Sequence, residues 1–321
     1  MSKSLAVVIV SWNTRELLRD CVRSVLAEQV VAQVVVVDNA SHDGSATMIQ
    51  HEFPQVICIA EAINHGFAKG NNIGLRVVLA AQTPPTYVCT LNPDTVVLPG
   101  ALAQLVAAMD AEPTLVGCGP QLRYGDGQWQ SSRRRYPTLG SYLCESTPLA
   151  QYWPHNPWRQ RYLMTDLPAA TSCRADWLVG AALVVRTSVV QQRGLFDEGF
   201  ALYSEEIEWQ RRLTAAQPGA IAYVAEAVVT HFEGQSSAQI PAQRLVWFFQ
   251  SRIRDAYLAY GAGVALLVRL GLLVMYGGEW LLEAGKWVVG HKRDLRATRM
   301  HTYAQLLKSL LIWHMHPAKI W

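Results

Sequence analysis

Four apolar runs rich in β-branched residues constrain the fold of this 321-residue chain more than any other feature. They cover residues 5–10, 34–37, 56–59 and 87–91. Such runs are typical of strands that are covered on both faces of a sheet. The segments between them place apolar residues at helical spacing, beginning with Leu17. This alternation predicts an α/β fold with a mostly parallel sheet flanked by helices.

Polar side chains follow the ends of these predicted strands. Asp38 comes directly after the second run, Asn64 follows the third, and Asn92-Pro93-Asp94 follows the fourth. Ligands of parallel sheets bind beyond the carboxyl ends of the strands. Because hard cations prefer oxygen ligands, the carboxylate of Asp94 can hold a divalent cation there against a diphosphate. An ordinary turn fixed by Pro93 is the alternative.

The remaining pattern divides into a middle and a C-terminal part. Residues 123–171 contain several prolines and aromatics and are expected to form long loops or short strands over the active face. This segment either shapes an acceptor site or is a plain surface loop. A strand is predicted over residues 177–185 and a helix over residues 204–213. We expect one catalytic domain over residues 1–242 and a helical extension over residues 243–321.

The C-terminal extension is both apolar and basic. Residues 243–321 contain eleven Lys and Arg against four Asp and Glu, a net charge of +7, whereas the rest carries seventeen against twenty-one, a net charge of −4. Within it, residues 263–290 are apolar but interrupted by charges such as Arg269 and Glu283. A spanning helix needs about 20 residues without central charge. An amphipathic helix or hairpin in the membrane plane, a spanning or re-entrant segment, and a buried core or oligomer helix all stay open.

This charge distribution predicts an anionic membrane surface as a partner rather than nucleic acid, and a dispersed solvated face is the alternative. The side chains expected to face lipid headgroups are His291, Lys292, Arg293, Arg296 and Arg299. The six scattered cysteines form no C-x-x-C pair, which fits a reducing cytoplasm. The first apolar run leads straight into folded pattern, which favours a strand over a signal peptide. We therefore expect a cytoplasmic protein, peripheral on the inner face of the cell membrane.

Short motifs occur in a fixed order between residues 7 and 236. They are VVIVSWN from Val7, VVVDNASxDG from Val35, NxGFAxGNN from Asn64, LNPD from Leu91, FDExF from Phe196, YxEE from Tyr203 and HxxGxS from His231. Together they resemble the motifs of family 2 glycosyltransferases, which have the GT-A fold, a Rossmann-like α/β architecture. The chain is most similar to the bacterial rhamnosyltransferase-like branch. The resemblance covers about 225 residues and leaves the C-terminal extension outside.

The resemblance implies an inverting transfer of a sugar from a nucleotide-diphosphate donor to a hydroxyl, with a divalent cation, Mn²⁺ or Mg²⁺, as cofactor. Asp94 matches the metal-binding acid, and Asn92 stands where many relatives carry the first Asp of a D-x-D motif. His231 matches a late histidine that helps to hold the metal. Glu206 matches the general base that takes the proton of the acceptor hydroxyl. Glu205 would then bind the acceptor or a lid residue.

The same resemblance implies a nucleotide site. Asp38 matches the residue that accepts a hydrogen bond from the pyrimidine imide, which uracil and thymine share. The first base-contacting loop is matched by Ser11 and Asn13. The loop that closes over base and ribose is matched by Asn64, Gly66 and Asn71. Dinucleotide and P-loop phosphate motifs do not occur in the sequence.

The expected activity is therefore a membrane-associated transfer of one sugar, with dTDP-rhamnose as the candidate donor, onto a lipid-linked or cell-envelope glycan in polysaccharide biosynthesis. Two alternatives stay open. One is an enzyme that uses a UDP-hexose or UDP-N-acetylhexosamine donor. The other is a catalytically inactive homologue that binds glycan or lipid.

Overall fold

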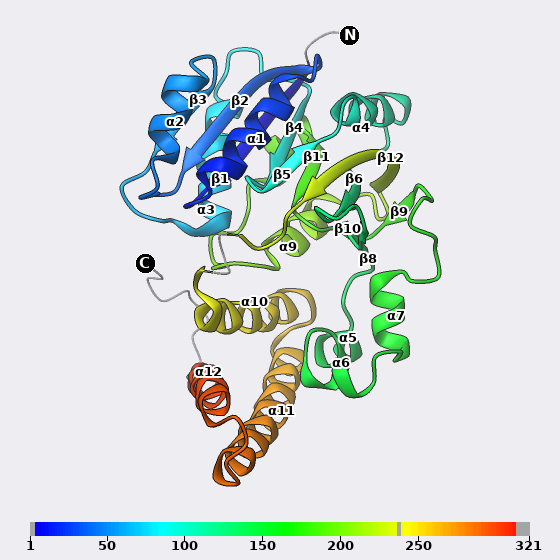
Figure 1. Cartoon of the computed structure of the whole chain (residues 1–321). Coiled ribbons are helices and arrows are strands. Elements are labelled where there is room, and N and C mark those ends of the chain that lie inside the picture. The colour runs from blue at the N-terminus through cyan, green and yellow to red at the C-terminus, as the bar shows by residue number, and fades with distance from the viewer. Residues whose placement is uncertain (1–3, 236–238, 313–321) are drawn as a thin grey trace.

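The four predicted strands form a parallel half-sheet in the computed structural model, which describes residues 4–235 and 239–312 (Figure 1). In spatial order they are β3 (Ile57–Ala60), β2 (Val31–Asp38), β1 (Leu5–Ser11) and β4 (Tyr87–Leu91). Each neighbouring pair in this half is parallel. The expected α/β fold with a mainly parallel central sheet is confirmed.

Beyond β4 the sheet becomes mixed. Its remaining strands are, in order, β11 (Ala182–Arg186), β6 (Gly117–Arg123), β12 (Ile221–His231) and β5 (Thr95–Val97). Two short strands pair at the side of this path, β7 (Trp129–Gln130) with β6 and β9 (Cys173–Ala175) with β12. The strand expected over residues 177–185 is divided. Its first part is β10 (Trp177–Leu178), which leaves the main sheet to pair with β8 (Arg133–Arg134), while β11 pairs with β4.

Helices cover both faces of the sheet, as the continuous apolar runs require. One core contains alternate β1 residues such as Val7 and packs under α1 (Arg15–Leu26), α2 (Ser45–Glu52) and α4 (Ala101–Ala111). The other contains the intervening residues, such as Val8. It packs under α3 (Gly66–Leu79), α8 (Thr187–Arg193) and α9 (Glu205–Leu213). Both cores are therefore built from the period-two alternation of the strands.

The middle segment contains three short helices that the sequence analysis did not predict. They are α5 (Leu139–Cys144), α6 (Pro148–Tyr152) and α7 (Pro157–Leu163). Their starts carry ordinary local signals. Thr138 forms a capping box with Ser141, Asn156 accepts a hydrogen bond from the Arg159 amide, and prolines occupy the first turns of α6 and α7.

The C-terminal extension is helical and has a core of its own. It consists of α10 (Pro241–Tyr260), α11 (Ala262–Val288) and α12 (Arg293–Leu311). Buried residues of all three helices meet Tyr142 of α5 in one cluster. Figure 1 shows α11 and α12 extending side by side away from the α/β body, with α5 and α6 beside the first half of α11. The predicted boundary at residue 242 falls just inside α10, and the division into two domains stays a prediction.

The helix α11 has two apolar faces. Ala265, Val268 and Leu272 are buried in the C-terminal core, whereas Val274 and Leu281 are 76% and 67% exposed. Among the described residues, α11 is the one helix that is long and apolar enough to cross a membrane, with a mean hydropathy of 1.5. Core helices of soluble proteins can meet the same criteria. Arg296, expected at the lipid headgroups, is instead buried and bonds Glu283 of α11 at 2.8 Å.

Contact between α3 and β1 is close enough to require glycine. A Cβ atom on Gly74 would lie 2.4 Å from Cγ1 of Val8 and 3.3 Å from Cγ2 of Val37. Both neighbours are β-branched and buried, so neither can rotate away easily. Gly74 thus sets how tightly the helix packs on the parallel half-sheet.

We predict that Gly74→Ala destabilises the protein by about 1–3 kcal/mol through overpacking, which outweighs the roughly 1 kcal/mol that alanine gains in a helix. Gly278→Ala in α11 is the matched control, because a Cβ atom at that position would have no neighbouring heavy atom within 4 Å. It should stabilise by up to about 1 kcal/mol. Urea midpoints measure both changes, and an equal gain in the two variants would contradict the tight packing of α3.

Candidate functional site

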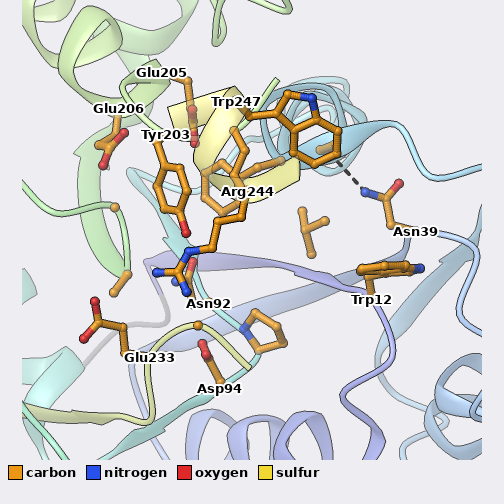
Figure 2. A pocket seen from close by; sticks show the side chains of 18 of the residues that line it. Trp12, Asn39, Asn92, Asp94, Tyr203, Glu205, Glu206, Glu233, Arg244 and Trp247 are labelled. Carbon is orange, nitrogen blue, oxygen red and sulfur yellow. Dashed lines mark hydrogen bonds between the residues drawn. The ribbon is translucent and has the colours of Figure 1, made fainter. Parts of the chain in front are cut away.

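A cavity of about 220 Å³ lies beyond the carboxyl ends of β1 and β4 (Figure 2). Its walls also come from the end of β12 and the first turns of α9 and α10. Of the residues predicted for the site, the cavity is lined by Ser11, Asn64, Gly66, Asn92, Asp94, Glu205, Glu206 and His231. Segments far apart in the sequence therefore meet at the edge where parallel strands place their ligands.

Asp94 and His231 form a pair of acceptors at the floor of this cavity. Their side chains are almost fully buried, and Oδ1 of Asp94 lies 3.4 Å from Nε2 of His231. Asn92 lies beside them, with Nδ2 at 3.3 Å from the same nitrogen. The side-chain oxygen of Asn92, Oδ1, is buried without a hydrogen-bond partner among the described residues.

Gln130 fixes which nitrogen of His231 faces the cavity. Its Nε2 donates to Oε2 of Glu233 at 2.9 Å, and an ionised carboxylate can only accept. The Oε1 of Gln130 therefore faces Nδ1 of His231, at 3.0 Å, and Nδ1 must carry the proton. Nε2 is then the acceptor nitrogen, and it faces the carboxylate of Asp94 and the side-chain amide of Asn92. A hydrogen-bonded outer partner of this kind is typical of histidines that bind metals.

The donor atoms fit a divalent cation, although they are few. Oδ1 of Asp94 and Nε2 of His231 lie 3.4 Å apart, and the side-chain amide of Asn92 lies beside them. No group of three or more His, Cys, Asp and Glu able to hold a metal occurs among the described residues. A cation here would take the remaining ligands from a bound substrate or from water.

Glu205 and Glu206 form the opposite wall. They occupy the first turn of α9, and the turn that precedes the helix holds Tyr203 and Ser204 at positive φ, 69° and 65°. Two successive non-glycine residues in the left-handed region cost about 1–2 kcal/mol each. Each glutamate has one buried carboxylate oxygen, Oε2, without a hydrogen-bond partner among the described residues. The strained turn thus directs both carboxyl groups into the cavity.

Burial dominates the titration of this pair. Burial, together with the carboxylate of Asp255, raises the pKa of Glu206 to about 7, although its own backbone N–H and those of Gly180 and Ser204 oppose the shift. Burial and then the Glu206 carboxyl raise the pKa of Glu205 well above its ordinary value. A helix N-terminus favours negative charge, but here desolvation outweighs it. A carboxyl with a pKa near neutrality is well suited to accept a proton.

Asp38 ends β2 in register with Ser11 of β1, but it is not itself among the residues that line the cavity. It is 3% exposed, and its Oδ2 accepts a hydrogen bond from the Ser41 amide at 3.1 Å. Its Oδ1 is buried and has no partner among the described residues. An acceptor left open in this way suits an N–H donor of a ligand. Ser11 is also buried, and its hydroxyl is 3.0 Å from that of Thr14.

Asn64 and Gly66 shape the turn that enters α3. Gly66 has φ 77° and its amide donates to Oδ1 of Asn64 at 2.9 Å. Asn39 holds the same turn from β2, because it accepts from the His65 amide and donates to the Gly66 carbonyl, both at 3.0 Å. Asn71 lies differently from expectation. It is buried, does not line the cavity, and donates to the carbonyl oxygen of Phe67 within its own helix at 3.0 Å.

Asn13 also lies outside the main cavity. Its backbone is left-handed, with φ 52°, and its Oδ1 accepts a hydrogen bond from the His42 amide at 2.8 Å. It borders a neighbouring groove together with Asp43 and Gln235. Its side chain therefore ties the first loop to the loop after β2. Ser236, the last residue of the final motif, lies outside the described residues.

Several cavity residues were missed from the sequence. Arg244 and Trp247 project from α10, and Figure 2 shows both near Tyr203. Their i,i+3 spacing places them on one helix face, which was the available signal, but Arg244 was counted with the basic extension. Glu233 also lines the cavity, two residues after His231 in the sequence. Gln130, which bonds both residues without lining the cavity, carried no local signal because only the fold brings it to His231.

The chain matches the family model described as "Glycosyl transferase family 2" over residues 6–178, more than half of its length. It is 29% identical over 252 residues to N-acetylglucosaminyl-diphospho-decaprenol L-rhamnosyltransferase of Mycobacterium tuberculosis, which covers 76% of this chain and 81% of that protein. It is 25% identical over 209 residues to the low-salt glycan biosynthesis hexosyltransferase Agl10 of Haloferax volcanii, covering 65% of this chain and 61% of that one.

Solved structures share the fold at low sequence identity. The mannosyltransferase PcManGT of Pyrobaculum calidifontis, in complex with GDP-Man and Mn²⁺, matches with TM-score 0.52 and 15% identity over 97% of this chain and 87% of its own. GalNAc-T7 with UDP, GalNAc and Mn²⁺ matches with TM-score 0.53 and 14% identity over 80% of this chain and 52% of its own. These likenesses support the GT-A architecture.

We predict a pH-dependent stability that Glu206→Gln removes. Glu206 has a pKa of about 7 in the folded protein against an ordinary 4.5, so the fold holds its proton more tightly. Its contribution to the free energy of unfolding is full below about pH 4.5 and is lost as pH rises through 7. Relative to the permanently neutral variant, the wild type should lose roughly 3 kcal/mol over that range. Urea unfolding at pH 4.5, 6 and 8 measures this, and parallel curves would disprove it.

Proposed function

The chain belongs to glycosyltransferase family 2, and on that basis we propose that it transfers one sugar from a nucleoside-diphosphate donor to a hydroxyl of a lipid-linked glycan. One observation carries the proposal. The acceptor pair Asp94–His231 and the raised-pKa carboxyl of Glu206 line the same cavity from opposite walls. The first suits a cation that binds a diphosphate, and the second suits a base for the acceptor hydroxyl.

The proposed reaction is an inverting displacement at the anomeric carbon. The bond between that carbon and the β-phosphate oxygen breaks, and its electron pair leaves with the nucleoside diphosphate. The acceptor oxygen forms the new bond, and its proton passes to Glu206. Burial excludes water from this carboxyl and keeps its pKa near neutrality, so both the basic and the protonated forms are accessible at physiological pH.

Asp94 and Nε2 of His231 would hold the divalent cation, Mn²⁺ or Mg²⁺. When bound, such a cation offsets the negative charge of a leaving diphosphate. Neutral imidazole suits Mn²⁺ better than Mg²⁺, and Gln130 keeps the imidazole in the required tautomer. The Mn²⁺ present in two structures of the same fold supports this proposal.

Donor and acceptor classes follow from the relatives. The mycobacterial relative is named for rhamnosyl transfer to a decaprenol-diphosphate-linked N-acetylglucosamine. By that similarity we propose dTDP-rhamnose as the donor and a polyprenyl-diphosphate-linked sugar as the acceptor. The open Oδ1 of Asp38 is the proposed partner of the pyrimidine imide, which dTDP and UDP donors share. UDP-hexose and UDP-N-acetylhexosamine donors are therefore the rivals.

Labelled donors test this proposal. We expect the protein with Mn²⁺ to move label from dTDP-rhamnose to a polyprenyl-diphosphate-linked acceptor, and more slowly, if at all, from UDP-sugars. Glu206→Gln should lower turnover at least ~10²-fold with little change in donor affinity, as for a lost general base. Glu205→Gln should act mainly on the acceptor KM. Asp94→Asn should cripple the Mn²⁺-dependent transfer while leaving the fold intact.

Transfer only from a UDP donor would replace the proposed sugar, and absence of donor binding and transfer would identify an inactive homologue. A severe loss in Glu205→Gln beside a mild one in Glu206→Gln would reverse the two assigned roles.

We further propose that the protein is cytoplasmic and binds the inner face of the cell membrane through the exposed face of α11. Leu267, Val274 and Leu281 recur every seven residues, so they lie on one face of the helix, and all are more than half exposed. Exposed Lys292 and Arg293 follow at the start of α12 and suit anionic headgroups. Apolar burial and charge attraction together support such docking.

We predict that replacing Leu267, Val274 and Leu281 together with serine lowers binding to phosphatidylglycerol vesicles at least ~10-fold, because apolar area drives interfacial binding. Ile57→Ser, an exposed apolar residue of β3, is the matched control and should bind as the wild type does. Wild-type binding should weaken partly with salt. Co-sedimentation measures each, and a wild type that stays in solution would rule out the membrane role.

A further inference from the structure

The charges that line the cavity are unbalanced. Asp94, Glu205, Glu206 and Glu233 place four carboxyl groups around it. Among the described residues of the cavity wall, Arg244 is the one guanidinium or ammonium group. A nucleoside diphosphate carries negative charge, which the carboxylates of this wall repel and a positively charged side chain attracts. The arginine is therefore the group in this cavity that is electrostatically complementary to a diphosphate.

The guanidinium of Arg244 is held in the cavity without a carboxylate partner among the described residues. It lies over the ring of Tyr203, whose centroid is 5.7 Å from the guanidinium carbon. Other arginines nearby are committed to ion pairs, Arg211 with Asp255 at 2.6 Å and Arg254 with Asp197 at 2.7 Å. Arg244 thus keeps its five donors for a ligand.

The position of Arg244 is set by a helix and not by a loop. It lies in the first turn of α10, three residues before Trp247, which is 4% exposed and lines the same cavity. Figure 2 shows the arginine side chain extending from α10 into the cavity on the side of Asn92 and Glu233. Packing of Trp247 therefore fixes the helix face from which the guanidinium reaches inward.

We propose that Arg244 binds the diphosphate of the donor and stabilises the charge that develops on the leaving nucleoside diphosphate. This inference rests on the proposed glycosyl transfer. As the bond from the anomeric carbon to the β-phosphate oxygen breaks, the electron pair moves onto that oxygen. The planar fork of an arginine can donate two parallel hydrogen bonds to phosphate oxygens, and these strengthen as the charge grows.

The test compares Arg244→Gln with Arg193→Gln, which removes an exposed arginine of α8 that does not line the cavity. Turnover of Arg244→Gln should fall at least ~10²-fold, the usual loss for a group that stabilises developing charge. Its affinity for dTDP or UDP in the presence of Mn²⁺, measured by calorimetry, should fall at least ~10-fold. Affinity for the nucleoside monophosphate should change far less, because the base and ribose contacts remain.

Two further measurements separate this role from a structural one. Arg244→Lys keeps the charge without the fork, so it should recover only part of the turnover. Added guanidinium should partly restore Arg244→Ala at concentrations that leave the wild type unaffected, whereas a misfolded variant would not recover. Wild-type diphosphate affinity and turnover in Arg244→Gln would overturn the inference. Failure of the wild type to bind any nucleoside diphosphate would instead contradict the proposed function.

Discussion

The aligned carboxyl ends of the parallel strands are the constraint on which the rest of this molecule depends. Ser11 at the end of β1 is in register with Asp38 at the end of β2, and Ile9 is in register with Leu91 at the end of β4. Loops that leave these strands therefore start from one edge. The antiparallel pairing of β12 with β5 then brings His231 opposite Thr95, next to Asp94. Backbone hydrogen bonding, more than side-chain contact, assembles the cavity floor.

The wall of the cavity opposite Asp94 places two carboxyl groups where burial disfavours their charged forms. Glu205 and Glu206 are adjacent, each has a buried carboxylate oxygen, and a left-handed turn precedes them, so the fold accepts both desolvation and backbone strain at one point. Tight packing elsewhere offsets this cost. Trp209 of the same helix is fully buried against Phe196, with ring centroids 4.1 Å apart, and its indole donates to the Gly194 carbonyl at 2.9 Å. The middle of α9 is thus anchored while its first turn is strained.

Local pattern was enough to predict the strands and to identify the residues that meet at the cavity, because β-branched runs and short motifs are encoded within a few positions. It was not enough for Asn13 and Asn71, whose side chains bond nearby backbone and lie away from the cavity. The short helices α5–α7 escaped because each spans at most seven residues, too few to show a helical period of apolar residues. Arg244 and Trp247 escaped for another reason. Their place in the cavity depends on how α10 packs against the α/β part of the chain, and this packing cannot be predicted from the local spacing of apolar residues.

That packing joins the two halves of the chain closely. Asp255 of α10 is fully buried, bonds Arg211 of α9 at 2.6 Å and accepts a hydrogen bond from the Tyr142 hydroxyl of α5. The helix that begins the extension is therefore also a wall of the cavity. An exchange of C-terminal extensions between relatives would consequently exchange part of the pocket as well. The extension and the pocket therefore form one packed unit and not two interchangeable modules.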